Sequence, residues 1–401
     1  MTILAGYKSY NGRHWETGTV ANYYAYRQVF APHTGKPYSE TLMLGVSGGI
    51  VMGYFSFAYK GYDPHTAILT RNTFDPMDTF LERLGIAQHI MQTNNPKTAI
   101  KNLIDTLESG LPAIVWADVF SMPYNGMDDA GMWQMYPILV YGYDEAEDIV
   151  HIADRSKVPL TVTTAELESA RGRVKIDKNR IITLGDPNPE KLVSAVQKGI
   201  WDTIKLFTDK PPKGSKENFG FAAYKRWGEL LINPKPKSSW ARVFPPGRPF
   251  VAGLMSAYYS IIQNSICGDA ERGRYSDFLE EASLILNKPG LKEASPLFRL
   301  SGEAWMKLCA ALLPDDFPYF RQMRDLIYRK QELFLEIGGE ALIEIQEINR
   351  QLEELKREAE TNFPLRENEM KQLLENLRQH ILQTHDTELL AVSALQSAIE
   401  S

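Results

Sequence analysis

The chain has 401 residues, of which 44% are hydrophobic and 23% charged, so it can bury more than one apolar core. Its 44 Lys and Arg against 50 Asp and Glu give a net charge of −6, which lacks the basic excess that nucleic-acid binding requires. Wholesale disorder and DNA or RNA binding are therefore not expected. The first residues carry no basic segment followed by an apolar one, so we expect a cytoplasmic protein.

The first half of the chain predicts helices followed by short strands. Apolar and aromatic residues recur at three- and four-residue steps after Glu16, which predicts a helix beginning at Glu16 or Thr17. Further helices are predicted over residues 76–84 and 96–109, the latter ending at a glycine. Short β-branched or aromatic runs then predict strands over residues 111–118, 137–143, 149–154 and 158–162. This order predicts an α+β fold with an antiparallel sheet.

Residues 42–59 run without a charged residue and contain four glycines and two serines. A membrane span needs about 20 apolar residues, and glycine at this density is atypical of one. We interpret the run as a buried glycine-rich turn and helix.

The remaining chain predicts a helix over residues 164–171, a strand near 174–184 and a helix over 189–207, followed by proline-rich, charged segments. Residues 1–208 are therefore predicted as an α+β domain, 209–249 as a connecting segment and 250–401 as a helical domain. Two apolar stripes, one from Leu342 to Leu355 and one from Met370 to Ile381, predict a C-terminal antiparallel helical hairpin. Such a hairpin would also suit an oligomer contact.

Several short motifs resemble one family. They are His14-Trp15-Glu16-Thr17-Gly18, Gly45-Val46-Ser47-Gly48-Gly49, the runs at residues 116–118 and 122–124, the strand at residues 136–144 and the Ile152-Ala153-Asp154 ending. This pattern is similar to the butirosin biosynthesis protein H family. The resemblance implies a papain-like fold, similar to bacteriocin-processing cysteine peptidases, that moves an acyl group from a carrier-protein thioester to an amine.

The chain departs from the catalytic pattern of that family. The family has a Cys directly after the first His and a second His at the start of the strand, and these positions hold Trp15 and Tyr136 here. The acidic position is retained as Asp154. An indole and a phenol cannot replace a thiolate and a proton shuttle at neutral pH, so Cys-dependent acyl transfer is not expected. Cys267 and Cys309 lie in the helical half, in no metal-binding spacing, and are interpreted as packing residues.

Thr17 and Ser47 are alternative nucleophiles, and each also has a possible structural role. Thr17 is a candidate nucleophile, with Asn11 as an oxyanion donor and Glu16 or His14 as a base, but Thr17 also suits a helix cap. Ser47 lies in a GxSxG pattern, which is typical of a strand-to-helix nucleophile elbow and also of close backbone packing.

The candidate site is accordingly divided into catalytic residues and ligand-pocket residues. Glu16, Thr17 and Asp154 are the catalytic candidates, and the pocket candidates are Asn11, His14, Trp15, Ser47 and Tyr136. Trp15 is predicted to contact Tyr136 at the start of a buried helix, and Tyr136 to donate a hydrogen bond to Asp154. No metal or cofactor motif is present, so neither is expected.

Three functions remain open. The first is a binding protein of specialised metabolism for a small acyl or amine ligand, with an acyl-carrier protein as a partner implied by the resemblance. The second is an enzyme of altered mechanism that uses His14, Glu16 or Asp154 on an acyl, amide or amine substrate. The third is a structural protein that forms a homo-oligomer through its C-terminal helices. None of these involves nucleic acid or a membrane.

Overall fold

The computed structural model describes residues 2–127, 131–209 and 217–401. The chain forms two compact units, each assembled from segments that are distant in sequence. The sheet unit comprises Met1–Met43, Met77–Leu192 and Lys330–Glu347. The helical unit comprises Leu44–Pro76, Val193–Arg329 and Ile348–Ser401. The predicted division into continuous domains differs from these units. Residues 44–76 lie in the predicted α+β domain but belong to the helical unit, and residues 330–347 lie in the predicted helical domain but belong to the sheet unit.

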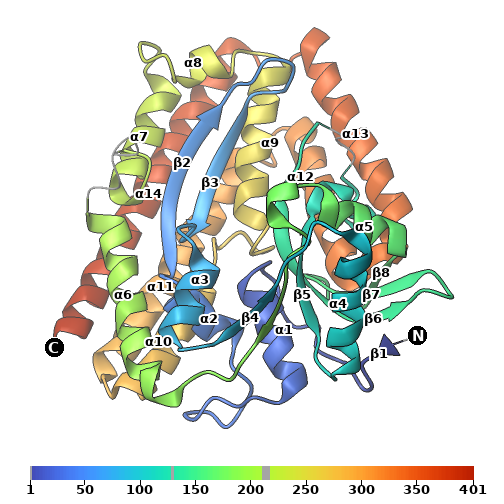
Figure 1. Ribbon diagram of the computed structural model, residues 1–401. Helices are drawn as coiled ribbons and strands as arrows, with labels where there is room; N and C mark the ends of the chain where they lie inside the picture. Colours follow the sequence, from blue (N-terminus) through green and yellow to red (C-terminus); the bar gives the residue numbers. More distant parts are fainter. Residues whose placement is uncertain (1, 128–130, 210–216) are drawn as a thin grey trace. The chain divides into compact units, whose positions relative to one another are not determined.

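The sheet unit is built on an antiparallel sheet of seven strands (Figure 1). The strands follow the order β4-β9-β5-β6-β7-β8, and β1 pairs with β6. Their bounds are β1 (Thr2–Ile3), β4 (Gln88–Met91), β5 (Ala113–Asp118), β6 (Met135–Asp144), β7 (Ile149–Ala153), β8 (Leu160–Val162) and β9 (Ile181–Leu184). Strand β6 pairs with three neighbours and is buried along most of its length, which is why its sequence is almost continuously apolar.

Four helices of the sheet unit begin close to their predicted positions. They are α1 (Thr17–Arg27), α3 (Pro76–Arg83), α4 (Pro96–Glu108) and α5 (Thr164–Gly172). The side chain of Asn95 caps α4, and Thr163 with Glu166 forms a capping box on α5. Helices α1 and α4 contact β6, and α5 contacts β5 and β7. Short 3-10 turns lie between these elements: η1 (Val119–Ser121), η2 (Pro123–Asn125), η3 (Lys175–Asp177), η4 (Pro189–Lys191) and η5 (Gly338–Ala341).

The helical unit contains one hairpin that the sequence analysis did not predict. Helix α2 (Glu40–Val46) is followed by a glycine turn and by the antiparallel strands β2 (Ile50–Phe57) and β3 (His65–Arg71). The prediction of a helix within residues 42–59 is therefore wrong beyond Val46. A continuously apolar run is compatible with either a buried helix or a buried strand, and pairing with β3 decides for the strand. No described helix is both long enough and apolar enough to cross a membrane.

The remaining helices follow in sequence. They are α6 (Leu192–Thr208), α7 (Gly220–Ile232), α8 (Trp240–Val243), α9 (Arg248–Ile262), α10 (Arg272–Leu286), α11 (Pro289–Leu312), α12 (Pro318–Glu336), α13 (Leu342–Thr361) and α14 (Glu367–Glu400). These helices belong to the helical unit, apart from residues 330–347 of α12 and α13, which belong to the sheet unit. Part of the predicted connecting segment, residues 210–216, lies outside the described residues. Its described part carries α7 and α8, whose Trp227 and Trp240 are fully buried. An α+β part followed by a largely helical part is thus confirmed for the fold class.

The predicted C-terminal helical hairpin is wrong. Helix α14 packs against α7 and α11 rather than pairing with α13 (Figure 1). The apolar stripe of α14, with Leu373, Leu377 and Ile381, is buried within the chain by these contacts. An apolar stripe requires a packing partner, but it does not specify which helix provides it.

A fully buried ion pair lies within the helical unit. Arg272 and Glu388 are both inaccessible to solvent, and Arg272 Nε lies 2.6 Å from Glu388 Oε1. Arg272 also donates to the carbonyl oxygens of Thr70 and Val51, and Tyr224 and Ser301 donate to Glu388. The charges are stabilised by these additional hydrogen bonds, which a buried pair needs to compensate its desolvation.

Candidate functional site

The segment before α1 is held against the first turn of the helix by close backbone packing. Gly12 donates its N–H to Asn22 Oδ1 at 2.9 Å. A Cβ on Gly12 would lie 2.2 Å from the carbonyl oxygen of Gly18, so no larger residue fits at this position. This packing places His14 and Trp15 directly at the N-terminus of α1.

Glu40 organises the same helix start. Its carboxylate accepts hydrogen bonds from the backbone N–H groups of Arg13 at 2.9 Å and His14 at 3.0 Å. It also accepts from the Thr17 hydroxyl at 3.2 Å. A carboxylate at a helix N-terminus is stabilised by the helix dipole. Thr17, a candidate nucleophile, is 1% exposed, and its hydroxyl is bonded to Glu40.

The indole of Trp15 stacks on the phenol of Tyr136. Their ring centroids are 4.3 Å apart and their planes differ by 13°. Trp15 is 9% exposed, and its Nε1–H has no hydrogen-bond partner among the described residues. The predicted contact between Trp15 and Tyr136 at the start of a buried helix is therefore confirmed.

Tyr136 lies on β6, opposite Ala117 of β5. Its hydroxyl accepts a hydrogen bond from the side chain of Gln134. Burial raises the pKa of Tyr136 above its usual value, and the nearby Glu16 carboxylate raises that pKa further. The phenol is thus neutral at physiological pH and provides an aromatic face rather than a base.

Asp154 is paired with its sequence neighbour. Its carboxylate accepts from Arg155 Nε at 3.1 Å and Nη2 at 3.0 Å, and from the Tyr124 hydroxyl at 3.3 Å. The predicted hydrogen bond from Tyr136 to Asp154 is wrong. The β6–β7 register pairs Leu139 with Ala153, which leaves Tyr136 beyond the end of β7, and Tyr124 from η2 provides the phenol instead.

Arg155 links this carboxylate to the aromatic stack. Its guanidinium carbon lies 4.2 Å from the ring centre of Trp15 and 4.7 Å from that of Phe334. Arg155 Nη2 also donates to Asn125 Oδ1 at 2.6 Å. We call Trp15, Tyr136, Asp154, Arg155 and Phe334 the Trp15 cluster. The cluster combines aromatic faces with one charge-compensated ion pair inside the sheet unit.

The other predicted site residues occupy different environments. Asn11 is exposed, and the loop hydrogen bond is made by Asn22 instead. His14 is partly buried beside Trp15, with ring centroids 6.0 Å apart, and its Nδ1 accepts from the Glu16 N–H at 3.3 Å. Ser47 belongs to the helical unit and donates its hydroxyl to the Leu44 carbonyl at 2.8 Å.

The glycine-rich run around Ser47 is not a nucleophile elbow. It connects helix α2 to strand β2, which is the reverse of the strand-to-helix order that an elbow requires. A Cβ on Gly45 would lie 2.2 Å from the ring of Phe278, and one on Gly49 would lie 2.1 Å from Thr203 Oγ1. Close packing within the helical unit therefore explains these glycines.

A comparison with protein families agrees with the motifs found in the sequence. Residues 14–155 match the family model described as butirosin biosynthesis protein H, N-terminal. The matched region covers about a third of the chain and extends from His14 to Arg155, so it contains most of the Trp15 cluster. A search of the curated proteins found no match. The chain thus resembles the butirosin protein H family in its N-terminal part.

The butirosin-H-like region offers no thiol for acyl transfer. The two cysteines belong to the helical unit, where Cys267 is exposed and Cys309 is buried. Burial raises the pKa of Cys309 to about 12, which suppresses its thiolate at neutral pH. Among the residues that the structure describes, no three His, Cys, Asp or Glu side chains converge in a way that would hold a metal ion.

Two residues of the Trp15 cluster were not identified from the sequence. Arg155 directly follows Asp154, which was a candidate, but no motif in the sequence marks it. Phe334 lies in α12, about 180 positions farther along the chain. Only the return of residues 330–347 to the sheet unit brings Phe334 to Arg155.

Proposed function

We propose that the chain is a binding protein of specialised metabolism for a small acyl or amine ligand, on an acyltransferase-like fold without Cys-dependent acyl transfer. The observation that carries the proposal is the stack of Trp15 on Tyr136. The family resemblance implies that these two residues stand where the butirosin protein H family has its Cys and His. The resemblance of residues 14–155 to that family supports the choice of ligand class.

The chemistry of the Trp15 cluster favours binding over turnover. A stacked indole and a neutral phenol provide apolar surface but neither a nucleophile nor a base. Asp154 is held by two bonds from Arg155, so its charge is already compensated. The buried Trp15 Nε1–H lacks a partner, and a carbonyl oxygen of an acyl ligand would satisfy it.

A partner follows from the same proposal. The family resemblance implies an acyl-carrier protein that would present the acyl group. Self-association through the C-terminal helices is the weaker partner proposal, because the apolar stripe of α14 is already buried against α7 and α11.

The test compares binding and turnover with one defined ligand, the butyryl thioester of N-acetylcysteamine, in the presence of ethanolamine. Saturation-transfer NMR should detect binding to the wild type, and chromatography should detect no thiol release or amide product. Trp15→Ala should abolish the NMR signal, whereas Asn11→Ala, at an exposed position outside the cluster, should retain it. Amide formation by the wild type that is lost in Glu16→Gln would instead establish an enzyme of altered mechanism.

A gain-of-function pair tests the correspondence of positions. Trp15→Cys combined with Tyr136→His restores the family's nucleophile and proton shuttle. Peptide mapping by mass spectrometry should then detect a butyryl adduct at the Trp15→Cys position. The control, Trp15→Ala with Tyr136→His, keeps the imidazole without the thiol and should give no such adduct. Equal labelling of the two double variants would contradict the assignment.

A further inference from the structure

A second feature of the sheet unit lies around Arg171, on the last turn of α5. The Arg171 side chain is 3% exposed although Gly172 and Arg173, which follow it, are exposed. Its Nη2 donates to the carbonyl oxygen of Asn179 at 2.7 Å, and its buried Nε has no hydrogen-bond partner. No ion pair joins this guanidinium to a carboxylate of the described residues. A buried cation in this state is costly for folding, which requires an explanation.

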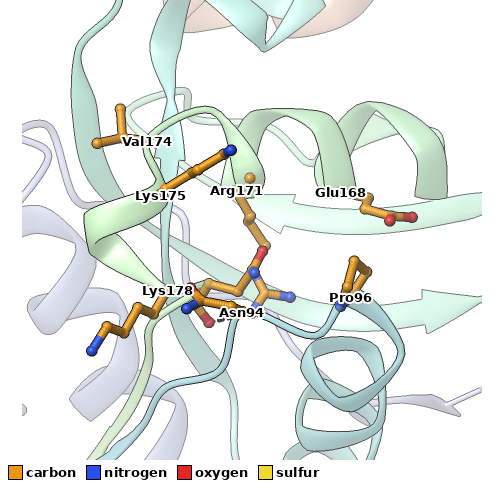
Figure 2. Close-up of a pocket in the computed structure, with 9 residues that line it drawn as sticks. Asn94, Pro96, Glu168, Arg171, Val174, Lys175 and Lys178 are labelled. Atoms are coloured by element: carbon orange, nitrogen blue, oxygen red, sulfur yellow. Dashed lines mark hydrogen bonds between the residues drawn. The ribbon is translucent and has the colours of Figure 1, made fainter.

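Arg171 lines a pocket of about 410 Å³, which we call the Arg171 pocket (Figure 2). Lys175 and Lys178 also line the pocket, and Glu168 is the one acidic residue among the lining residues. The residues that line the pocket therefore carry three positive charges and one negative charge. Figure 2 shows Arg171 between Lys175 and Asn94, with Glu168 nearer the start of α5. Both lysines are exposed, so Arg171 is the inner cation and the lysines form the rim.

The walls of the pocket are positioned by hydrogen bonds between two segments. Thr93 donates its N–H to the Lys178 carbonyl at 2.7 Å, and Asn179 Nδ2 donates to the Thr93 carbonyl at 3.0 Å. Lys178 and Asn179 both have left-handed backbone angles, with φ of 49° and 48°, which non-glycine residues rarely adopt. This strained turn directs the Asn179 carbonyl at Arg171 and is held by the Thr93 segment.

The start of α4 adds to the positive potential. Asn94 and Pro96 line the pocket, and Pro96 is the first residue of this 13-residue helix. Pro96 has no backbone N–H, and the Thr98 N–H already donates to Asn95 Oδ1, so the terminus favours an anion chiefly through the helix dipole. The helix terminus and the incompletely paired cation of Arg171, which lines the pocket, therefore favour the same type of ligand.

From these observations we propose that the Arg171 pocket binds a small phosphorylated molecule, with its phosphate on Arg171 and between the rim lysines. A phosphate monoester carries between one and a half and two negative charges at neutral pH, about the excess positive charge of the lining. A guanidinium donates two parallel hydrogen bonds to phosphate. The pocket volume lies in the range of small-molecule sites and leaves room for an organic group.

Burial lowers the pKa of Arg171 to about 10, so the guanidinium remains charged at neutral pH. This inference is independent of the proposed function, because none of its residues belongs to the Trp15 cluster.

The experiment is isothermal titration of the full chain with glycerol 3-phosphate, inorganic phosphate and succinate. Glycerol 3-phosphate should bind most tightly and its affinity should fall with added salt. Arg171→Met should weaken binding by about 100-fold, since charge-assisted hydrogen bonds are lost. Lys175→Ala and Lys178→Ala, which alter only the rim, should each weaken it by about 2- to 5-fold. Lys101→Ala, on the exposed face of α4, is the matched control and should leave affinity unchanged.

A stability measurement separates ligand binding from a structural role. Arg171→Met removes an incompletely paired buried cation, so its melting temperature without ligand should equal or exceed that of the wild type. A folded Arg171→Met variant that still binds glycerol 3-phosphate at wild-type affinity would overturn the proposal. So would succinate binding as tightly as glycerol 3-phosphate, or no binding of either phosphate to the wild type.

Discussion

Arg155→Ala tests whether the ion pair of the Trp15 cluster holds the sheet unit together. The substitution removes the two side-chain hydrogen bonds to Asp154 and the one to Asn125. It also removes the guanidinium that lies over the rings of Trp15 and Phe334. Asp154 then remains buried, with the Tyr124 hydroxyl as its remaining side-chain donor.

The expected magnitude follows from the burial of the two partners. Removing one member of a buried pair costs about 3–5 kcal/mol, because the other charge is left uncompensated. The Asp154 side chain is 1% exposed but that of Arg155 is 14% exposed, so water screens part of the interaction. We therefore expect a loss of about 3 kcal/mol in the free energy of unfolding, at the lower end of that range.

The assay is native-state hydrogen exchange of β6 and β7, which reports the sheet unit separately from the helical unit. The control is Lys157→Ala, two positions away, which removes an ion pair to Glu336 whose side chains are 48% and 50% exposed. That change should alter the free energy by less than about 1 kcal/mol. If Arg155→Ala cost no more than Lys157→Ala, the cluster would not depend on this ion pair and the reasoning would be refuted.

Three further predictions concern the helical unit. Glu388→Ala should lower the free energy of unfolding by at least about 3 kcal/mol in thermal denaturation, because the substitution leaves the buried Arg272 guanidinium without its carboxylate. A loss below about 1 kcal/mol would contradict this prediction. Iodoacetamide at pH 8 should label Cys267 and leave Cys309 unmodified, as read by mass spectrometry, because with a pKa of about 12 only about one Cys309 in ten thousand is a thiolate. Labelling of Cys309 should accelerate as the pH rises, and equal labelling rates of the two cysteines at pH 8 would contradict the prediction. Gly45→Ala should destabilise the unit by about 1–3 kcal/mol in urea unfolding, because its Cβ would overlap the ring of Phe278, and unchanged stability would show that the ring relaxes freely.

Local sequence was sufficient for much of the sheet unit. The helix start at Thr17 and the capping box at Thr163 and Glu166 depend on residues within one or two turns. The strands β5, β6 and β7 could likewise be read from short β-branched runs bounded by turn residues. The contact of Trp15 with Tyr136 was predictable because family resemblance assigned both positions before their geometry was known.

Tertiary structure decided which distant segments meet. The run at residues 50–57 is a strand because β3 pairs with it, and its uniform apolarity carried no helical or strand period. The stripe of α14 faces α7 and α11, since periodicity identifies a buried face but not its partner. The partners of Asp154 come from η2 and from its own neighbour because the β6–β7 register places Tyr136 beyond its reach. Phe334 joins them only because residues 330–347 return to the sheet unit, a long-range event that no local pattern encodes.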